Sequence, residues 1–350
     1  KKMKLVLSNA FRAAFGSSSS RTLDPLFCGV RHAAVSSFIG RSRTSITTPK
    51  VLPSLGINCC RGHSSTSLTA ITPSHRLDGL DKPTVWEEFT PLAVEHNAVN
   101  LGQGFPDWEP PSFVINAMTM SITERKANQY ARSAAHMPLA EVLAEEYAKK
   151  LNRPFIHAQT EVATTVGCTQ AFYCAMQGLI NPMDEVILIE PAFDIYSAQV
   201  KMAGGLPKFL PLRQHEPNKE GSTTHLNANE VFRLDMDELK ATITPRTKIL
   251  VINTPHNPTG KMFSKEELQD IADIVEQHPQ LTVIADEVYE YIIFDKEHSP
   301  HVHFASLPGM YERTLTLSSS GKTFSCTGWK VGWAIGPPSL IRPVASVQQW

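Results

Sequence analysis

The stretch Leu281–Glu290 reads LTVIADEVYE and joins a short apolar run to a cluster of acidic and aromatic residues. Two other runs, EVILI at Glu185–Ile189 and KILVI at Lys248–Ile252, have the same apolar form. Strands that are apolar at nearly every position are typical of parallel sheets covered on both faces. The three runs therefore predict an α/β fold with a mostly parallel sheet, in which ligands bind beyond the carboxyl ends of the strands.

From about residue 75, strand and helix patterns alternate along the chain. Ser264 and Glu267 form a capping-box signature ahead of an apolar stripe with helical spacing. Further strands are expected at Glu161–Val166, Thr314–Ser318 and Val331–Ile335, and helices at Pro138–Leu151, Gln170–Ile180, Ser264–Gln277 and Pro338–Trp350.

The charge of the chain is distributed unevenly. Residues 1–71 hold ten basic residues and one acid, so the net charge of −1 leaves about −10 on residues 72–350. An acidic body argues against a nucleic-acid surface, which needs clustered Lys and Arg. No run approaches the roughly 20 apolar residues of a membrane helix. We therefore expect neither nucleic acid nor membrane as a partner.

Residues 1–71 are rich in Ser and Thr and carry scattered Arg. This composition favours an organellar transit peptide over a secretory signal, whose apolar run is longer. Mitochondrial targeting is the expectation, with a disordered tail on a cytoplasmic protein as the alternative.

The cysteines and histidines suggest no metal centre. Cys174 fits a core position, and no CxxC pair is present, so neither a disulfide framework nor a zinc site is expected. His301 and His303 have no carboxylate or thiol beside them at ligand spacing and are interpreted as loop residues.

Asp286 follows the strand LTVIA directly. A carboxylate at the end of a buried strand is costly unless a cation meets it. A metal could do so, and a protonated pyridine nitrogen would serve equally well, because it would stay charged and withdraw electrons from a substrate carbanion.

KILVI is followed by NTPHNPTG, residues 253–260, which two prolines and a glycine make a rigid turn. The turn is either a plain strand-to-helix connection or a support for Asn257. In the second case Asn257 and Tyr289 would both face the phenolic oxygen of a pyridine ring.

Lys322 lies in SSGKTFSCTGWK, residues 319–330, after another expected strand. Gly321-Lys322-Thr323 resembles part of a P-loop, but that motif needs a glycine at position 316, where Thr stands. A lysine on a small-residue loop near a second cation, Lys330, is a better candidate for an imine-forming amine. Taken alone, such a lysine is more often simply solvated.

Two further segments suit a flat anionic ligand. Gly167-Cys168-Thr169-Gln170 lies between a strand and a helix, where backbone N–H groups bind phosphate well. Phe193 follows EVILI and could stack on a flat ring.

Together these segments resemble the fold-type I, pyridoxal-phosphate (PLP)-dependent aminotransferases of class I/II, most closely the kynurenine aminotransferase and cysteine-S-conjugate β-lyase group. The resemblance covers roughly residues 75–350. Its motifs are VNLGQGFPDWEPP (Val99–Pro111), NQYARS (Asn128–Ser133), IEPAFDIY (Ile189–Tyr196), NTPHNPTGK (Asn253–Lys261), DEVYE (Asp286–Glu290) and SSGKTFSCTGWKVGW (Ser319–Trp333).

The resemblance implies a role for each matching residue. Lys322 would be the catalytic residue that links to the cofactor and moves the proton. Asp286 would pair with the pyridine nitrogen, Asn257 and Tyr289 would hold the phenolic oxygen, and Phe193 would stack on the ring. The phosphate would be bound by Cys168, Thr169, Ser319 and Lys330. The substrate would be contacted by Gly104, Trp86 and Asn253, and by Tyr130 of a neighbouring subunit, because these enzymes are homodimers.

Two departures from the family pattern are evident. Family members usually carry glycines where Cys168 and Gln170 stand. They are also expected to continue for about a hundred residues past the position of Trp350, with an arginine that binds the substrate carboxylate through two hydrogen bonds.

The expected domains are a transit peptide or disordered segment at 1–71, an N-terminal arm with part of the small domain at 72–115, a large PLP-binding domain at 116–340 and the start of an incomplete C-terminal small domain at 341–350. The expected activity is transfer of the amino group of kynurenine or a related aromatic or sulfur amino acid to a 2-oxo acid, with β-elimination from cysteine S-conjugates. The alternative is an inactive, truncated chain that binds cofactor or pairs with a complete subunit, and a P-loop protein is a third hypothesis.

Overall fold

The computed structural model describes residues 72–350 except 81, 105, 107 and 215–227. The expected transit peptide lies outside the described residues. From Ser74 onward the described chain belongs to one compact unit. The expected domain boundaries at 115/116 and 340/341 therefore fall within this unit and stay predictions.

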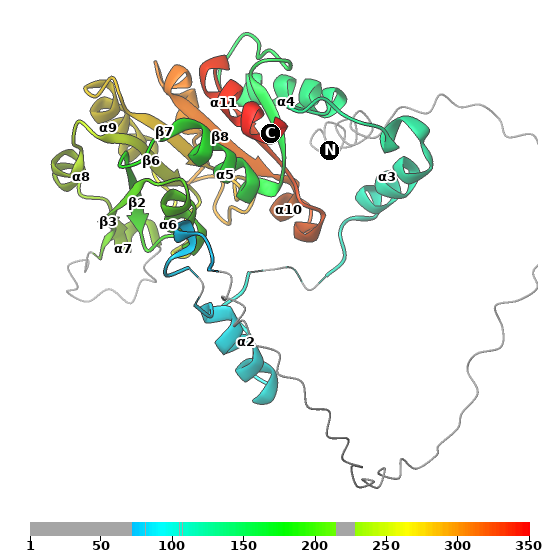
Figure 1. The fold of residues 1–350 in the computed structure, drawn as a ribbon, viewed down its shortest axis with the longest axis horizontal. Coiled ribbons are helices and arrows are strands. Elements are labelled where there is room, and N and C mark those ends of the chain that lie inside the picture. Colours follow the sequence, from blue (N-terminus) through cyan, green and yellow to red (C-terminus); the bar gives the residue numbers. More distant parts are fainter. Residues whose placement is uncertain (1–71, 81, 105, 107, 215–227) are drawn as a thin grey trace, which may run out of the picture. The chain divides into compact units, whose positions relative to one another are not determined.

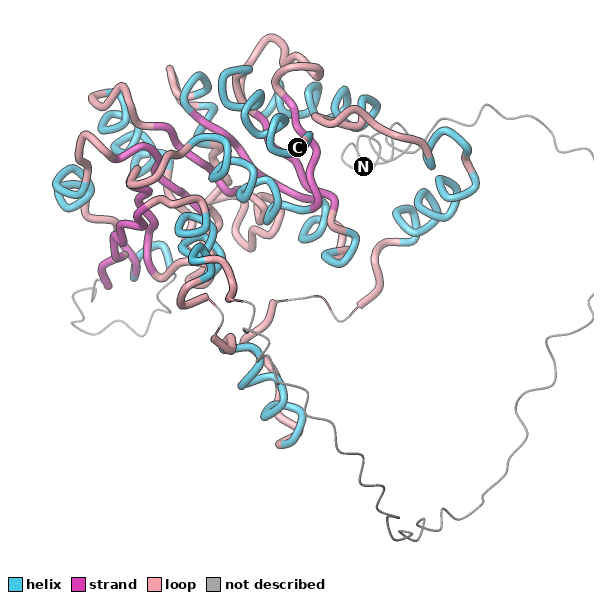
Figure 2. Tube along the Cα trace, viewed as in Figure 1, coloured by secondary structure: helices cyan, strands magenta, loops and turns pink. Residues whose placement is uncertain are grey.

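Within the described residues, seven strands form one sheet in the order β1-β9-β8-β7-β6-β2-β3 (Figures 1 and 2). All neighbours from β3 to β8 run parallel, whereas β9 runs antiparallel to both β8 and β1. The predicted mostly parallel sheet is thus confirmed. The strands are β1 (Val162–Val166), β2 (Glu185–Glu190), β3 (Leu206–Pro211), β6 (Thr247–Asn253), β7 (Thr282–Asp286), β8 (Thr314–Ser319) and β9 (Val331–Ile335), and a separate antiparallel pair is formed by β4 (Arg213–Gln214) and β5 (Phe232–Arg233).

The helices are α2 (Val85–Glu95), α3 (Ser112–Thr123), α4 (Met137–Lys150), α5 (Gly167–Leu179), α6 (Asp194–Met202), α7 (Ala228–Val231), α8 (Met236–Thr242), α9 (Lys265–Glu276), α10 (Ser320–Thr323) and α11 (Pro338–Gln349). Helices α5, α6 and α11 pack in one core cluster with the sheet, and α8 and α9 pack in another. Short 3₁₀ turns are η1 (His75–Leu77), η2 (Arg125–Asn128), η3 (Phe304–Ser306), η4 (Tyr311–Arg313) and η5 (Thr327–Trp329).

Alternate side chains of the central strands point to opposite faces of the sheet, as the strand period of two requires. Leu188 of β2 packs in one core cluster with α5, α6 and α11. Its neighbour Ile187 packs in a second cluster with α8 and α9. Both residues are fully buried, and burying one such side chain contributes roughly 2–3 kcal/mol. Burial on both faces explains why the central residues of these strands are apolar at successive positions.

The predicted strands and helices are confirmed to within a few residues at their ends. One difference concerns Lys322, which was expected on a loop. Lys322 lies instead on α10, a single helical turn in which the Phe324 N–H donates to the Ser320 carbonyl at 2.9 Å. The turn begins immediately where β8 ends, so no extended loop separates the strand from Lys322.

The sheet register brings the polar strand ends together. Asn253, the last residue of β6, pairs with Asp286, the last residue of β7. Ser319, the last residue of β8, pairs with Gly332 of β9. The edge where the sequence predicts ligand binding is therefore assembled from adjacent strands.

The helices of the described part of the chain are too short or too polar to cross a membrane.

The structure confirms the capping box that the sequence predicts at the start of α9. The Ser264 hydroxyl accepts from the Glu267 N–H at 3.2 Å, and the Glu267 carboxylate accepts from the Ser264 N–H at 2.9 Å. We predict that Ser264→Ala lowers the free energy of unfolding by about 1 kcal/mol, because a helix donor loses its acceptor. Chemical denaturation measures this loss. Lys265→Ala, at the next and equally exposed position, is the control, and equal stability of the two variants would contradict the prediction.

Candidate active site

A cavity of about 640 Å³ opens at the carboxyl ends of β6, β7 and β8. Twelve of the thirteen residues singled out from the sequence line it. They are Trp86, Gly104, Cys168, Thr169, Phe193, Asn253, Asn257, Asp286, Tyr289, Ser319, Lys322 and Lys330. Tyr130 does not line this cavity, and its side chain is fully exposed.

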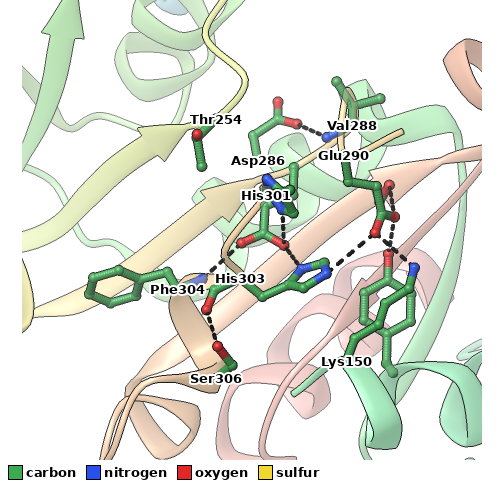
Figure 3. A network of polar contacts seen from close by, with 12 residues as sticks. Lys150, Thr254, Asp286, Val288, Glu290, His301, His303, Phe304 and Ser306 are labelled. Atoms are coloured by element: carbon green, nitrogen blue, oxygen red, sulfur yellow. Dashed lines mark hydrogen bonds and ion pairs between the residues drawn. The ribbon is translucent and has the colours of Figure 1, made fainter. Parts of the chain in front are cut away.

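Asp286 lies at the floor of the cavity and is 5% exposed. One carboxylate oxygen accepts from the Tyr196 hydroxyl at 2.6 Å, and the other accepts from the Val288 N–H at 3.2 Å (Figure 3) and lies 3.4 Å from the Cys168 thiol. Burial raises the pKa of the Asp286 carboxyl group, although the hydrogen bonds from Tyr196, Val288 and Cys168 oppose that shift. A cation placed beside Asp286 would favour its charged form.

Tyr196 was not predicted as a site residue, although it lies in the quoted IEPAFDIY segment. It is buried between Phe172, at 4.7 Å between ring centroids, and Phe193, at 5.8 Å. Its position three residues after Phe193, one turn into α6, was the available signal. Its hydroxyl fixes the Asp286 carboxylate from the α6 side.

Asn253 lines the cavity, but its side chain makes contacts within the protein. Its amide N–H donates to the Asp286 carbonyl at 2.8 Å, and its amide oxygen accepts from the Asn257 N–H at 2.7 Å. Asn253 therefore holds the proline-rich turn against the end of β7. Sequence reasoning gave it a substrate contact and missed this bridging role.

Asn257 and Tyr289 lie together on the cavity wall. Burial raises the pKa of Tyr289, with Asp286 and Cys168 adding to the shift, whereas a hydrogen bond with the Asn257 side chain opposes it. The phenol therefore stays protonated and can donate a hydrogen bond into the cavity.

Lys322 reaches into the cavity from α10. Its ammonium group donates to the Gly104 carbonyl at 2.9 Å and lies 5.7 Å from the centre of the Tyr289 ring. Burial lowers the pKa of Lys322, and the charge of Lys330 lowers it further. A lysine with a lowered pKa yields the neutral, nucleophilic amine more readily.

The N-terminus of α5 makes part of the cavity wall suited to an anion. Gly167 begins α5 with φ +76°, and Gly167, Cys168 and Thr169 line the cavity together with Ser319 and Lys330. Helix N-termini leave backbone N–H donors free for an anion.

The two residues that stand in place of family glycines, Cys168 and Gln170, each make a local contact. The Cys168 thiol points to Asp286, at 3.4 Å, so its backbone N–H stays available. The Gln170 side chain accepts from the Val166 N–H at 2.6 Å and so stabilises the turn before the helix.

The family description "aminotransferase class I and II" matches residues 96–349. This chain belongs to that family. It is 49% identical to a kynurenine–oxoglutarate transaminase of Dictyostelium discoideum, over 77% of this chain and 61% of the relative. It is 44% identical to kynurenine–oxoglutarate transaminase 1 of Rattus norvegicus, over 81% of this chain and 65% of the relative. The chain thus spans about three fifths of the length of these curated relatives.

Solved structures agree with this assignment. The fold is similar to N-succinyldiaminopimelate aminotransferase from Mycobacterium tuberculosis, with a TM-score of 0.70, 42% identity, and coverage of 79% of this chain and 67% of the other. It is also similar to aspartate aminotransferase from Thermus thermophilus with maleate, with a TM-score of 0.68, 30% identity, and coverage of 80% and 68%. The predicted fold class is confirmed.

Enzymes of this family depend on PLP, and the cavity fits that cofactor. Among the described residues, three donors contact the Asp286 carboxylate, which has about four acceptor positions when ionised, so one position remains for a ring N–H. The N-terminus of α5 and the side chain of Lys322 line the same cavity, where they would bind the phosphate and the aldehyde. The individual roles of these residues stay predictions.

Strand β9 packs closely on Gly167 and Cys168 at the start of α5, and this contact gives a specific test. A Cβ atom at Gly332 would lie 2.3 Å from the Gly167 carbonyl carbon and 2.6 Å from the Cys168 nitrogen. We predict that Gly332→Ala displaces the start of α5, lowers stability by about 1–3 kcal/mol and weakens PLP retention. Thermal unfolding and the PLP content after dialysis measure the two effects.

Gly328→Ala is the matched control, because a Cβ atom there meets nothing within 4 Å. Equal stability and equal PLP content in the two variants would show that the close approach is unimportant.

Proposed function

We propose that this chain works in a PLP-dependent transaminase that transfers the amino group of kynurenine, or of a related aromatic or sulfur amino acid, to a 2-oxo acid. The observation that carries the proposal is a single cavity in which Lys322, with its lowered pKa, and the buried carboxylate of Asp286 face the same space. The relatives named as kynurenine–oxoglutarate transaminases support the substrate class.

PLP, when bound, supplies an aldehyde that links to amino groups and a pyridinium ring that withdraws electrons from the substrate α-carbon. Asp286 would keep the ring nitrogen protonated, since a buried carboxylate is stabilised by a cation beside it. Tyr196 orients that carboxylate through its 2.6 Å hydrogen bond. Asn257 and Tyr289, which line the same cavity, would hold the phenolic oxygen.

Lys322 has two tasks in this scheme. Its amine would hold the cofactor covalently, which its lowered pKa favours. When free, the same amine would accept the proton from the substrate α-carbon and later return it. The Gly104 carbonyl positions the amine for this transfer.

Anion binding and the substrate side chain involve other residues. The Cys168 and Thr169 N–H groups, with Ser319 and Lys330, bind the phosphate and fix the cofactor along the cavity. Trp86 offers an aromatic surface at the cavity wall, which favours a substrate with a planar or apolar side chain. A leaving group at the β-carbon of a cysteine S-conjugate would be lost after the same proton removal, so β-elimination is part of the proposal.

The proposal includes a homodimer located in mitochondria. The fully exposed Tyr130 would contact the neighbouring subunit's cavity, and residues 1–71, rich in Ser, Thr and Arg, would direct import.

A fluorescent protein that carries residues 1–71 should then co-localise with a mitochondrial marker, and diffuse fluorescence in the cytoplasm would contradict the targeting proposal.

The attachment of the cofactor is tested with Lys322→Ala. Wild-type protein supplied with PLP should show the absorbance of a lysine-linked cofactor, and borohydride should fix the cofactor on the peptide that contains Lys322. The variant should lack that absorbance and lose transamination of kynurenine by several orders of magnitude, because both the attachment and the proton carrier are gone.

Lys201→Ala, which removes an exposed lysine of α6, is the control and should behave like the wild type. A borohydride-fixed cofactor on any other lysine of the wild-type chain would overturn the assignment.

A panel of amino donors, from kynurenine to aliphatic and acidic amino acids, measures the substrate preference, and a preference for acidic donors would contradict the proposed class.

A further inference from the structure

The end of β7 presents acids to two sides. Asp286 and Tyr289 line the cofactor cavity, whereas Glu287 and Glu290 are buried and do not line it. Figure 3 shows Glu290 with His301 and His303 in a separate polar network. Glu287 is fully buried in this network, and its side-chain partners come from η3 and the segment ahead of it. The proposed transaminase chemistry makes no use of this network.

The network contains a set of metal-ligating side chains that the sequence did not reveal. Glu287, His301 and His303 each offer a ligand atom, and these atoms all lie within 4.8 Å of one another. The two histidines do lie in a loop, as predicted, but the structure places the carboxylate of Glu287 beside them, which their sequence spacing did not indicate. A long connecting segment separates Glu287 from the two histidines in the sequence. Only the folded structure places its carboxylate beside them.

His301 points to a ligand. Its side chain is 6% exposed, yet neither ring nitrogen has a hydrogen-bond partner in the described part of the chain. Its Nε2 atom lies 3.6 Å from Oε2 of Glu287, too far for a hydrogen bond. Two ligands bound about 2.1 Å from one tetrahedral zinc ion lie roughly 3.4 Å apart, so the observed separation suits a shared ion.

The surroundings of the other two ligands resemble the outer shell of a metal site. Nδ1 of His303 contacts Glu287, and its Nε2 lies 3.5 Å from a carboxylate oxygen of Glu290 (Figure 3). Metal-bound histidines usually direct their second nitrogen to a carboxylate in this way. Oε1 of Glu287 accepts from the Phe304 N–H at 3.0 Å, which leaves Oε2 to face both histidines.

Glu290 is itself held in place. Lys150 donates to it at 2.7 Å and the Tyr147 hydroxyl at 2.9 Å. An ion pair between Glu287 and His303 would account for two of the three clustered side chains. It leaves both ring nitrogens of the buried His301 without a hydrogen bond in the described part of the chain, and a bound cation would satisfy one of them.

We propose that Glu287, His301 and His303 bind one divalent transition-metal ion, with zinc as the best match to two imidazoles and a carboxylate. The ion joins the end of β7 to the segment before η3, and so stabilises the strand end that carries Asp286 and Tyr289 on its other side. The site is independent of the proposed transamination, because its ligands do not line the cofactor cavity.

The test measures zinc directly on the full chain, stripped with a chelator. Cys59 and Cys60 are adjacent thiols that can bind zinc themselves, so all variants carry Cys59→Ser and Cys60→Ser. We expect one zinc ion per chain by elemental analysis after dialysis, and a rise in the unfolding temperature when zinc is added. His301→Ala and Glu287→Gln should each weaken zinc binding by about tenfold or more.

The matched control is His298→Ala, since His298 lies three residues before His301, is exposed and pairs with Asp295. The His298→Ala variant should bind zinc as tightly as the parent chain, which carries only Cys59→Ser and Cys60→Ser. Cobalt in place of zinc gives a readout that does not depend on the variants, because imidazole ligation produces visible absorption bands. Zinc binding in the parent no tighter than in His301→Ala, or a cobalt spectrum without imidazole ligation, would overturn the proposal.

Discussion

The buried carboxylate of Asp286 at the end of β7 is the constraint on which the site depends. Removing a carboxylate from water is costly, and here the cost is met by the Tyr196 hydroxyl, the Val288 N–H and the Cys168 thiol. These donors come from α6, from the chain just after β7 and from α5. The position of one acid therefore determines how two helices must approach the sheet edge.

The same strand end organises the opposite side of the sheet. Because successive side chains alternate, Asp286 faces the cofactor cavity while Glu287 faces the histidines ahead of η3. Glu290 extends that second network to Lys150 and Tyr147 of α4. The acidic segment at the end of β7 therefore contributes residues both to the cavity and to the contacts with α4, a helix that does not line the cavity.

Most of the candidate site could be predicted from the sequence because many of its residues lie at the end of a strand or near the start of a helix. Asp286, Lys322 and Cys168 all occupy such positions, and parallel strands bring them to one edge. Tyr196 and the bridging role of Asn253 were missed. Their functions depend on which side chains they meet across elements, and no local pattern encodes those contacts.

The sequence by itself determined the strands, the capped helix α9 and the family, because these depend on local periodicity and on motifs that are short and ordered along the chain. Only the tertiary structure decided that β9 runs antiparallel, that Lys322 lies on a helical turn against the Gly104 carbonyl, and that Glu287 meets His301 and His303. The physical reason is separation in the chain. Contacts between residues that are far apart depend on how whole elements pack, and packing is settled by the complete buried core and by no single segment.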